Sequence, residues 1–259
     1  MAEKELLFER HGPAAVLTFN RPEQRNAMTW AMYEGLVEAC DKVDADPDIR
    51  VFVLRGAGGK AFVAGTDIRQ FRSFREPKDA LEYEERIEKV LTRLEDVRKP
   101  TIAAVTGYAV GGGLMIALAC DLRICTPDSR FGAPIARTLG NCLAFGNYAR
   151  LVDLIGPART MELIYSARLV DADEAYRLGL VNEVVPADGF EQRLTELIET
   201  IAGHAPLTLS VTKQAVRRIQ RHRRPKGGED LVITCYMSED FREGVEAFLS
   251  KRQPNWKGR

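Results

Sequence analysis

Two glycine-bearing turns are the segments of this 259-residue chain best suited to chemistry. One is Ala64-Gly65-Thr66-Asp67-Ile68 and the other runs from Gly107 to Gly113. Each turn follows an apolar run typical of a strand and precedes a helical pattern. The first amides of a helix have no acceptor within the helix, and glycine lets the backbone come close to a ligand. Two such amides pointing at one oxygen would form an oxyanion hole.

The triple glycine, Gly111 to Gly113, also has other interpretations. It could allow tight packing of a helix on a strand, or it could hold a phosphate. It is not a P-loop, because no Gly-Lys-Ser or Gly-Lys-Thr follows, and it lacks the GxGxxG spacing of dinucleotide-binding proteins. Spacing alone therefore leaves an anion-stabilising role and a packing role open.

Composition disfavours several classes of protein. The chain has 37 Lys and Arg against 37 Asp and Glu, and this zero net charge disfavours a dedicated nucleic-acid binder. Its three histidines have no metal-ligand spacing, so we expect no metal site and no histidine triad. Five cysteines without a CxxC pair favour reduced thiols. No signal-peptide core or membrane-length apolar run is present, so we expect a cytoplasmic protein without membrane contact.

Alternating strand and helix patterns predict an α/β fold. The expected strands are 6–8, 14–19, 51–54, 61–64, 101–105 and 122–125. Helices are expected after Thr29, whose hydroxyl would cap the first turn, over 77–97 and over 114–119. This order implies parallel strands joined by crossover helices. Only helical patterns follow, at 188–202, 206–223, 228–238 and 239–251.

A series of motifs resembles the crotonase superfamily, the enoyl-CoA hydratase/isomerase proteins. Asn20 to Met28 is similar to its first CoA-binding loop, and the two glycine-bearing turns are similar to its two oxyanion segments. The other matching stretches are Phe131-Gly132-Ala133-Pro134, Gly179-Leu180-Val181-Asn182 and the tail from Glu243 to Phe248 with Lys251-Arg252. The motifs occur in order over nearly the whole chain, so together they are much more specific than any one alone.

The resemblance implies an architecture and an assembly. We expect a crotonase-like (ClpP/crotonase) spiral of ββα units over residues 1–200, carrying the CoA and oxyanion site. An all-helical oligomerisation region is expected over residues 201–259. Because the last helices of the family form trimers, the resemblance implies a homotrimer or a dimer of trimers.

The resemblance also implies a ligand and a mechanism. Members of the family bind an acyl-CoA thioester and hold the thioester oxygen between two backbone amides, which stabilises an enolate. By position, these amides belong to Thr66 and Gly112. Coenzyme A is then part of the substrate, and no tightly bound cofactor is expected. The residues that would contact CoA are Arg25, Ala27, Ala64, Asp67, Ile68 and Lys251.

The chain departs from the family pattern where hydratases carry two glutamates. The first of these positions is Met115, just after the triple glycine, and the second is Ile135, after Phe-Gly-x-Pro. Neither side chain can transfer a proton. The single-glutamate isomerases use the Ile135 position, and the aspartate position of other branches is Leu143. We therefore predict that the protein is not a standard two-glutamate hydratase.

A polar segment follows Ile135. Asn141 could orient a substrate or cap the next helix. Arg137 could bind a substrate carboxylate, although an ion pair at the surface is the favoured interpretation. Cys142 has no histidine nearby in the sequence, which favours a small core residue over a nucleophile.

Two charged stretches also have competing interpretations. Glu82, Glu84 and Glu85 could act as substitute bases, but charge on such a helix usually marks a solvated face. The basic run from Lys213 to Lys226 could contact CoA phosphates or RNA. A solvated face or a subunit contact is favoured for that run, and the neutral chain argues against RNA.

Three functions remain open at the level of the sequence. The first is an acyl-CoA lyase or isomerase with unusual acid–base groups. Decarboxylation fits best, because loss of CO2 needs oxyanion stabilisation but no base, although the product still needs a proton. The second is ordinary hydratase or isomerase activity through another group. The third is a non-catalytic acyl-CoA-binding subunit.

Overall fold

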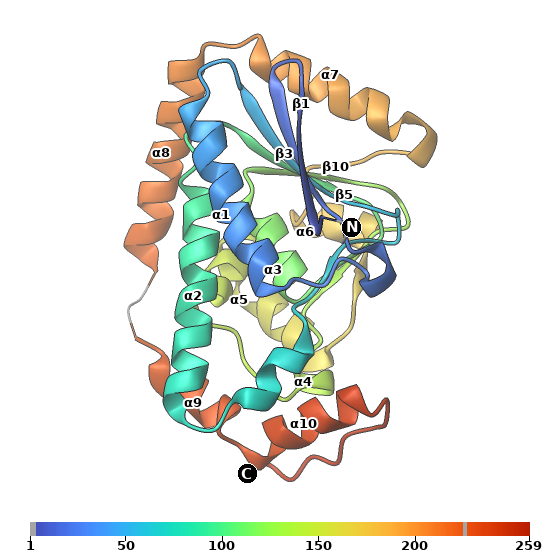
Figure 1. Cartoon of the computed structure of the whole chain (residues 1–259), viewed down its shortest axis with the longest axis vertical. Coiled ribbons are helices and arrows are strands. Elements are labelled where there is room, and N and C mark those ends of the chain that lie inside the picture. Colours follow the sequence, from blue (N-terminus) through green and yellow to red (C-terminus); the bar gives the residue numbers. More distant parts are fainter. Residues whose placement is uncertain (1–3, 225–226) are drawn as a thin grey trace.

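The computed structural model describes residues 4–224 and 227–259, and two sheets lie at its centre (Figure 1). The larger sheet has the order β1-β2-β3-β5-β7-β10 and the smaller has the order β4-β6-β8-β9. The larger sheet consists of β1 (Leu6–His11), β2 (Ala14–Phe19), β3 (Val51–Gly56), β5 (Thr101–Val105), β7 (Leu122–Cys125) and β10 (Glu183–Val184). The smaller consists of β4 (Ala61–Ala64), β6 (Tyr108–Val110), β8 (Arg130–Gly132) and β9 (Val170–Asp171).

The chain repeats one ββα unit three times. The pairs β3/β4, β5/β6 and β7/β8 each give one strand to the larger sheet and the next to the smaller. A helix follows each pair, and neighbouring strands of successive units pair in parallel in both sheets. The expected α/β architecture with parallel strands is confirmed, and β1 and β2 add an antiparallel hairpin.

The helices predicted from sequence are present. Helix α1 (Trp30–Ala45) begins where expected, since the Thr29 hydroxyl accepts a hydrogen bond from the Met32 amide at 3.2 Å. The other predicted helices are α2 (Pro77–Glu95), α3 (Gly112–Ala119), α7 (Phe190–Ala202), α8 (Pro206–Arg223), α9 (Glu229–Tyr236) and α10 (Glu239–Leu249). The remaining helical segments are η1 (Pro22–Gln24), η2 (Ile68–Ser73), α4 (Ile135–Thr138), α5 (Phe145–Ser166), α6 (Ala172–Leu178) and η3 (Ala187–Gly189).

The C-terminal helices help to build the main core. Helix α8 runs alongside α2, and α9 and α10 lie near the opposite end of α2 from the larger sheet (Figure 1). Val232 and Tyr236 of α9 and Phe241 and Val245 of α10 are buried in the same hydrophobic cluster as residues of the ββα units. The division of the chain near residue 200 stays a prediction, and the residues beyond it share the core of those before it.

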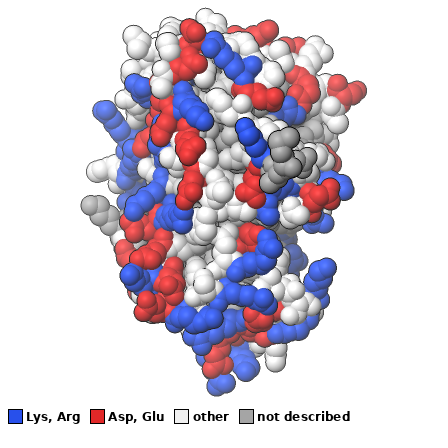
Figure 2. Space-filling model, in the orientation of Figure 1, with Lys and Arg blue, Asp and Glu red and all other residues white. Residues whose placement is uncertain are grey.

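Charges of both signs are interspersed over the face of the molecule seen in Figure 2. No helix within 4–224 and 227–259 is both long and apolar enough to span a bilayer.

Candidate active site

The two glycine-bearing turns meet at one edge of the smaller sheet. Strands β4 and β6 pair in parallel, with Ala64 opposite Val110, so the turns that follow them lie side by side. Gly65 and Gly111 have φ values of +92° and +57°, which favour glycine. A Cβ added to Gly111 would lie 3.7 Å from the Cα of Gly65. The turns are therefore in direct contact.

The amides of Thr66 and Gly112 do not donate to the backbone hydrogen bonds that hold the two turns. Gly112 is the first residue of α3, and amides in the first turn of a helix have no intrahelical acceptor. Met28 and Thr66 form a parallel bridge that uses the Gly65 carbonyl and the Asp67 amide, each at 2.9 Å from Met28. The amide of Thr66 does not take part in that bridge. Neither amide is thus used by these backbone hydrogen bonds.

A cavity of about 810 Å³ opens over these turns. It brings together ten of the eleven residues singled out from the sequence. They are Arg25, Ala27, Ala64, Thr66, Asp67, Ile68, Gly112, Met115, Ile135 and Asn141. The eleventh, Lys251, follows α10 and is exposed outside this lining, so its contact with CoA stays a prediction.

Charged side chains lie at one part of the cavity wall. The guanidinium of Arg25 lies 5.5 Å from the centre of the Tyr108 ring. Asp67 caps η2 by accepting a hydrogen bond from the Arg69 amide at 3.2 Å. The hydrogen bond from the Arg69 side chain holds the pKa of Asp67 below its usual value. Asp67 is thus the cap of the following helical turn.

Met115 and Ile135 contribute apolar surface to the same cavity. Met115 lies on α3 and Ile135 is the first residue of α4, and both side chains are buried. Leu143 also lines the cavity. At these three positions the cavity wall has no group that could exchange a proton.

Two tyrosines hold the side chain of Thr66. The hydroxyls of Thr66 and Tyr33 are 2.8 Å apart, and Tyr83 donates to the Thr66 hydroxyl at 3.2 Å. Burial raises the pKa of both tyrosines above the ordinary value, which keeps their hydroxyls protonated. A Cβ on Gly112 would lie 3.0 Å from the Tyr33 hydroxyl, so a side chain there would crowd this cluster. Sequence reasoning missed both tyrosines.

A second polar cluster lines the cavity at Glu84, Asn141 and Tyr236. Tyr236 of α9 donates a hydrogen bond to Oε1 of Glu84, and the Asn141 side-chain amide donates to the Tyr236 hydroxyl at 3.2 Å. Asn141 does not cap the next helix, since the N-cap of α5 is Ala144. This cluster joins the loop after α4 to α2 and α9.

The solvated-face interpretation is wrong for Glu84. Glu82 and Glu85 are exposed as expected, but only 8% of Glu84 is exposed. Burial raises the pKa of Glu84 to about 7, despite the opposing hydrogen bond from Tyr236. A signal was present in the sequence: Glu84 lies three and seven residues before Ile87 and Leu91, which is the spacing of the inner face of the helix.

Cys142 and Arg137 do not form a reactive pair. Cys142 is buried, and its neighbour Cys235 together with burial raises the pKa of its thiol, which disfavours a thiolate. The side chain of Arg137 is exposed on α4.

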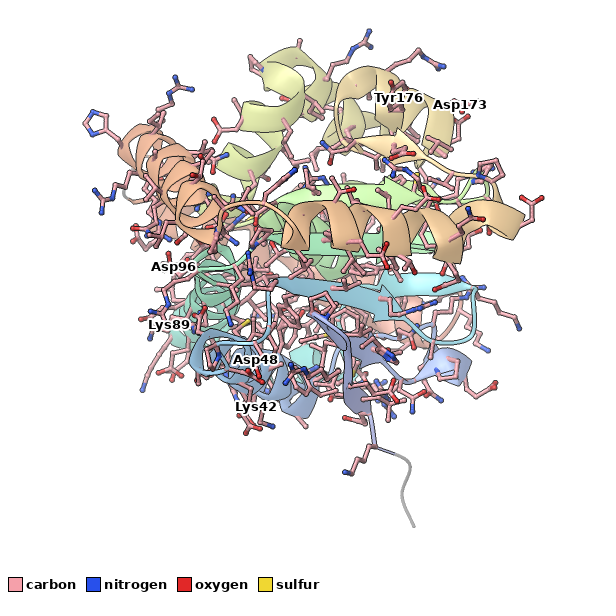
Figure 3. All side chains as sticks on the ribbon, turned by 90° about the horizontal axis from the view of Figure 1, so that it is seen from above. Lys42, Asp48, Lys89, Asp96, Asp173 and Tyr176 are labelled. Carbon is pink, nitrogen blue, oxygen red and sulfur yellow. The ribbon has the colours of Figure 1, made fainter. Side chains whose placement is uncertain are left out.

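Ion pairs within the chain occupy much of the basic run. Lys213 and Arg217 contact Asp121 at 2.7 and 3.1 Å. Arg221 pairs with Asp96, which lies beside α8 at the end of α2 (Figure 3). A purely solvated face is therefore wrong for Arg217, which is buried, and the subunit contact stays a prediction. The last member of the run, Lys226, lies outside the described residues.

Known proteins match this chain over nearly its full length. The family model described as enoyl-CoA hydratase/isomerase matches residues 9–259. A crotonyl-CoA hydratase of Syntrophomonas wolfei is 34% identical, with 99% of each chain covered. The 2,3-dehydroadipyl-CoA hydratase of Escherichia coli is also 34% identical, over 98% of this chain and 99% of its own.

Solved structures share the fold. A methylmalonyl-CoA decarboxylase in complex with 2-nitronate-propionyl-CoA has a TM-score of 0.90 and 28% identity, covering 100% of both chains. An enoyl-CoA hydratase/carnithine racemase from Magnetospirillum magneticum has a TM-score of 0.81 and 33% identity, over 100% of this chain and 97% of its own. From the repeated ββα units, the paired turns and these matches, we conclude that the chain has the crotonase fold and belongs to the enoyl-CoA hydratase/isomerase family.

Proposed function

We propose that the protein is an acyl-CoA enzyme that stabilises a thioester enolate with the amides of Thr66 and Gly112. The main observation behind this proposal is that Thr66 and Gly112 line the same cavity as the apolar side chains of Met115 and Ile135. Each preorganised donor lowers the barrier by about 3 kcal/mol in comparable oxyanion holes. Without carboxyls at 115 and 135, the site lacks the pair that would activate a water molecule for hydration.

Decarboxylation of a 2-carboxyacyl-CoA suits this arrangement best. The bond between Cα and the departing carboxylate breaks, its electron pair moves toward the thioester oxygen, and CO2 leaves. This step needs stabilisation of the oxyanion but no general base. The likeness to a methylmalonyl-CoA decarboxylase supports a decarboxylation on this fold, and the apolar side chains of Met115 and Ile135 favour it over hydration.

The remaining predicted residues would bind the CoA portion. Arg25, Ala27, Ala64, Asp67 and Ile68 surround the same opening, so they would contact the nucleotide and pantetheine parts. Lys251 would reach a phosphate from the C-terminal tail. Coenzyme A would enter and leave as part of the thioester, with no tightly bound cofactor.

An acyl-CoA panel followed by mass spectrometry tests the activity. We expect loss of CO2 from methylmalonyl-CoA or malonyl-CoA and little hydration of crotonyl-CoA. Rapid hydration of crotonyl-CoA would contradict the proposal. Tight binding of every thioester without turnover would instead favour a non-catalytic binding subunit.

Gly112→Ala tests the oxyanion site directly. Its Cβ would lie 3.0 Å from the Tyr33 hydroxyl and 3.2 Å from the Thr66 hydroxyl, so it would push on the two hydroxyl groups packed against this turn. We expect kcat to fall by about 100-fold or more. Gly189→Ala is the matched control, because a Cβ there meets nothing within 4 Å. Equal kcat values for the two variants would contradict the assignment.

We also propose that the chain forms a homotrimer or a dimer of trimers. Helix α8 exposes the apolar side chains of Leu207, Val211, Val216 and Ile219, which a second copy could cover. Light scattering on the purified protein should give three or six times the mass of the chain, and a monomer would contradict the proposal.

A further inference from the structure

Two carboxyls line the cavity among the described residues, and their surroundings differ. Asp67 has arginine partners: Arg69 binds it directly and Arg21 lies 3.9 Å away. Its pKa is lowered, so it stays ionised near neutral pH. Glu84 is 8% exposed, and its carboxyl interacts with the hydroxyl of Tyr236 and the backbone amide of Ala144, neither of which carries a charge. Glu84 is thus the cavity carboxyl suited to gaining and losing a proton.

A short chain of hydrogen bonds fixes the position of the Glu84 carboxyl. Asn141 donates to Tyr236 at 3.2 Å, and Tyr236 donates to Glu84. Oδ1 of Asn141 is buried and has no hydrogen-bond partner within residues 4–224 and 227–259. Because a buried acceptor without a partner is costly, a donor from a ligand or water would complete the cluster. Three side chains from separate segments are therefore arranged around space that the cavity leaves for a ligand.

The groups facing Glu84 are neutral or acidic. They comprise Tyr33 on α1, Tyr83 and Glu88 on α2, Cys142 before α5, Tyr148 on α5 and Tyr236 on α9. The nearby Arg150 binds Glu88 at 2.7 Å. Burial therefore dominates and raises the pKa of Glu84 to about 7, so both protonation states are populated near neutral pH.

Glu84 is also linked to the oxyanion segment through its own helix. Tyr83 is the preceding residue of α2, and its hydroxyl donates to the Thr66 hydroxyl at 3.2 Å. The same turn of α2 thus contacts Thr66 through one side chain and lines the cavity through the next. A shift of this turn would move both groups together.

We propose that Glu84 is a catalytic residue that exchanges a proton with Cα of the bound acyl group, and that Tyr236 and Asn141 are positioning residues. The inference rests on the proposed function. After CO2 leaves, Cα of the enolate forms a bond to the proton of the Glu84 carboxylic acid. The electron pair of the O–H bond stays on the carboxylate, which then takes a proton from water. In the reverse sense, the carboxylate removes a Cα proton and the electron pair moves to the thioester oxygen.

This assignment gives the cavity an acid–base group from a different element. The apolar positions Met115 and Ile135 lie on α3 and α4, whereas Glu84 comes from α2. A single carboxyl that exchanges one proton supports protonation of an enolate. It does not replace the pair of carboxyls that hydration would use.

Deuterium incorporation into propionyl-CoA in D2O tests the proposal, because this thioester has Cα protons but can neither be hydrated nor lose CO2. Mass spectrometry follows the exchange, and calorimetry follows binding. For Glu84→Gln we expect exchange to fall by about 100-fold or more while Kd changes less than about threefold. Glu85→Gln is the matched control, because Glu85 is the next residue of α2 and is exposed. It should exchange at the wild-type rate.

Tyr236→Phe separates a positioning role from a purely structural one. The hydrogen bond from Tyr236 lowers the pKa of Glu84, so its loss should move the midpoint of the exchange rate to higher pH. Glu84→Asp should retain part of the exchange that Glu84→Gln loses, and circular dichroism checks that each variant is folded.

Three results would overturn the inference. One is exchange by Glu84→Gln at the wild-type rate, and a second is equal loss in Glu85→Gln. The third is wild-type protein that binds propionyl-CoA but incorporates no deuterium at Cα. That result would overturn the role of Glu84 but not the binding of acyl-CoA. Failure of the wild-type protein to bind any acyl-CoA would instead contradict the proposed function itself, and the inference with it.

Discussion

Helix α2 carries two buried glutamates in opposite electrostatic environments. Glu84 and Glu95 lie on the same side of the helix, since eleven residues span about three turns. The exposed fractions of the two residues are 8% and 1%. Glu84 borders the cavity and contacts a tyrosine hydroxyl, whereas Glu95 lies among arginines. The comparison shows how one helix can supply both a structural carboxylate and a carboxyl suited to chemistry.

Glu95 is held by guanidinium groups from two other helices. Arg150 of α5 lies 2.9 Å from its carboxylate, Arg224 at the C-terminal end of α8 lies at 2.8 Å, and Arg217 within α8 lies at 3.5 Å. Burial acts to raise the pKa of Glu95, but the hydrogen bonds from Arg224 and the charge of Arg150 lower it to about 2. Glu95 therefore stays ionised and joins α2 to α5 and α8.

Glu84 has the same burial without such compensation. A buried carboxyl without a cation holds its proton more tightly, whereas one with guanidinium partners releases it more easily. Perturbed carboxyls in cavities are typical of functional sites, but ion-pair networks perturb pKa values too. The partners of each residue, rather than its burial, thus distinguish the two roles.

The largest effect on stability is expected for Glu95→Ala. The substitution leaves Arg150, Arg217 and Arg224 buried or half-buried without their shared anion. We expect the free energy of unfolding at pH 7 to fall by about 3 to 5 kcal/mol, measured by urea denaturation. Activity per folded molecule should be retained. A loss below about 1 kcal/mol would contradict the structural role given to Glu95 in this comparison.

Glu84→Gln should change stability in a pH-dependent way. The folded-state pKa of Glu84 is raised from 4.5 to about 7, so its favourable contribution is present below pH 4.5 and is lost as pH rises through about 7. Relative to the wild type, the variant should therefore gain up to about 3 kcal/mol between pH 5 and pH 8. Urea denaturation at both pH values measures this, and a difference that does not change with pH would contradict it.

Tyr236→Phe tests whether hydrogen bonding controls the pKa of Glu84, because it removes the hydroxyl that stabilises the ionised carboxylate. Its hydrogen bond lowers the pKa of the carboxyl, so the pKa should rise by about one unit in the variant. The pH dependence of deuterium exchange measures the shift. A midpoint that moves to lower pH would show that Tyr236 acts on another group.

The smallest effect is expected for Glu85→Gln. Glu85 is exposed and pairs with Lys89 at 2.7 Å on the surface of α2. Its loss should change the free energy of unfolding by less than about 0.5 kcal/mol. A larger change in thermal unfolding would mean that burial does not separate the roles of neighbouring glutamates on this helix.

The sequence by itself determined the fold class and the two glycine-bearing turns that border the cavity. Apolar strands alternating with helical patterns predicted the parallel α/β arrangement, because hydrophobic spacing is a local property of the chain. The glycines of the two turns indicated where the backbone bends, because the φ values of Gly65 and Gly111 favour glycine. The family resemblance then assigned the two amides to Thr66 and Gly112.

Only the tertiary structure decided the surroundings of the side chains. Glu82, Glu84 and Glu85 are alike in the sequence, yet packing of α9 against α2 buries Glu84 alone of the three and brings Tyr236 to it across 152 residues. Similarly, Arg150 and Arg224 reach Glu95 from positions 55 and 129 residues away. Proton affinity depends on desolvation and on nearby charges, and both are set by residues distant in sequence. The positions of the two turns therefore follow from the local sequence, whereas the proton affinities of Glu84 and Glu95 follow from packing.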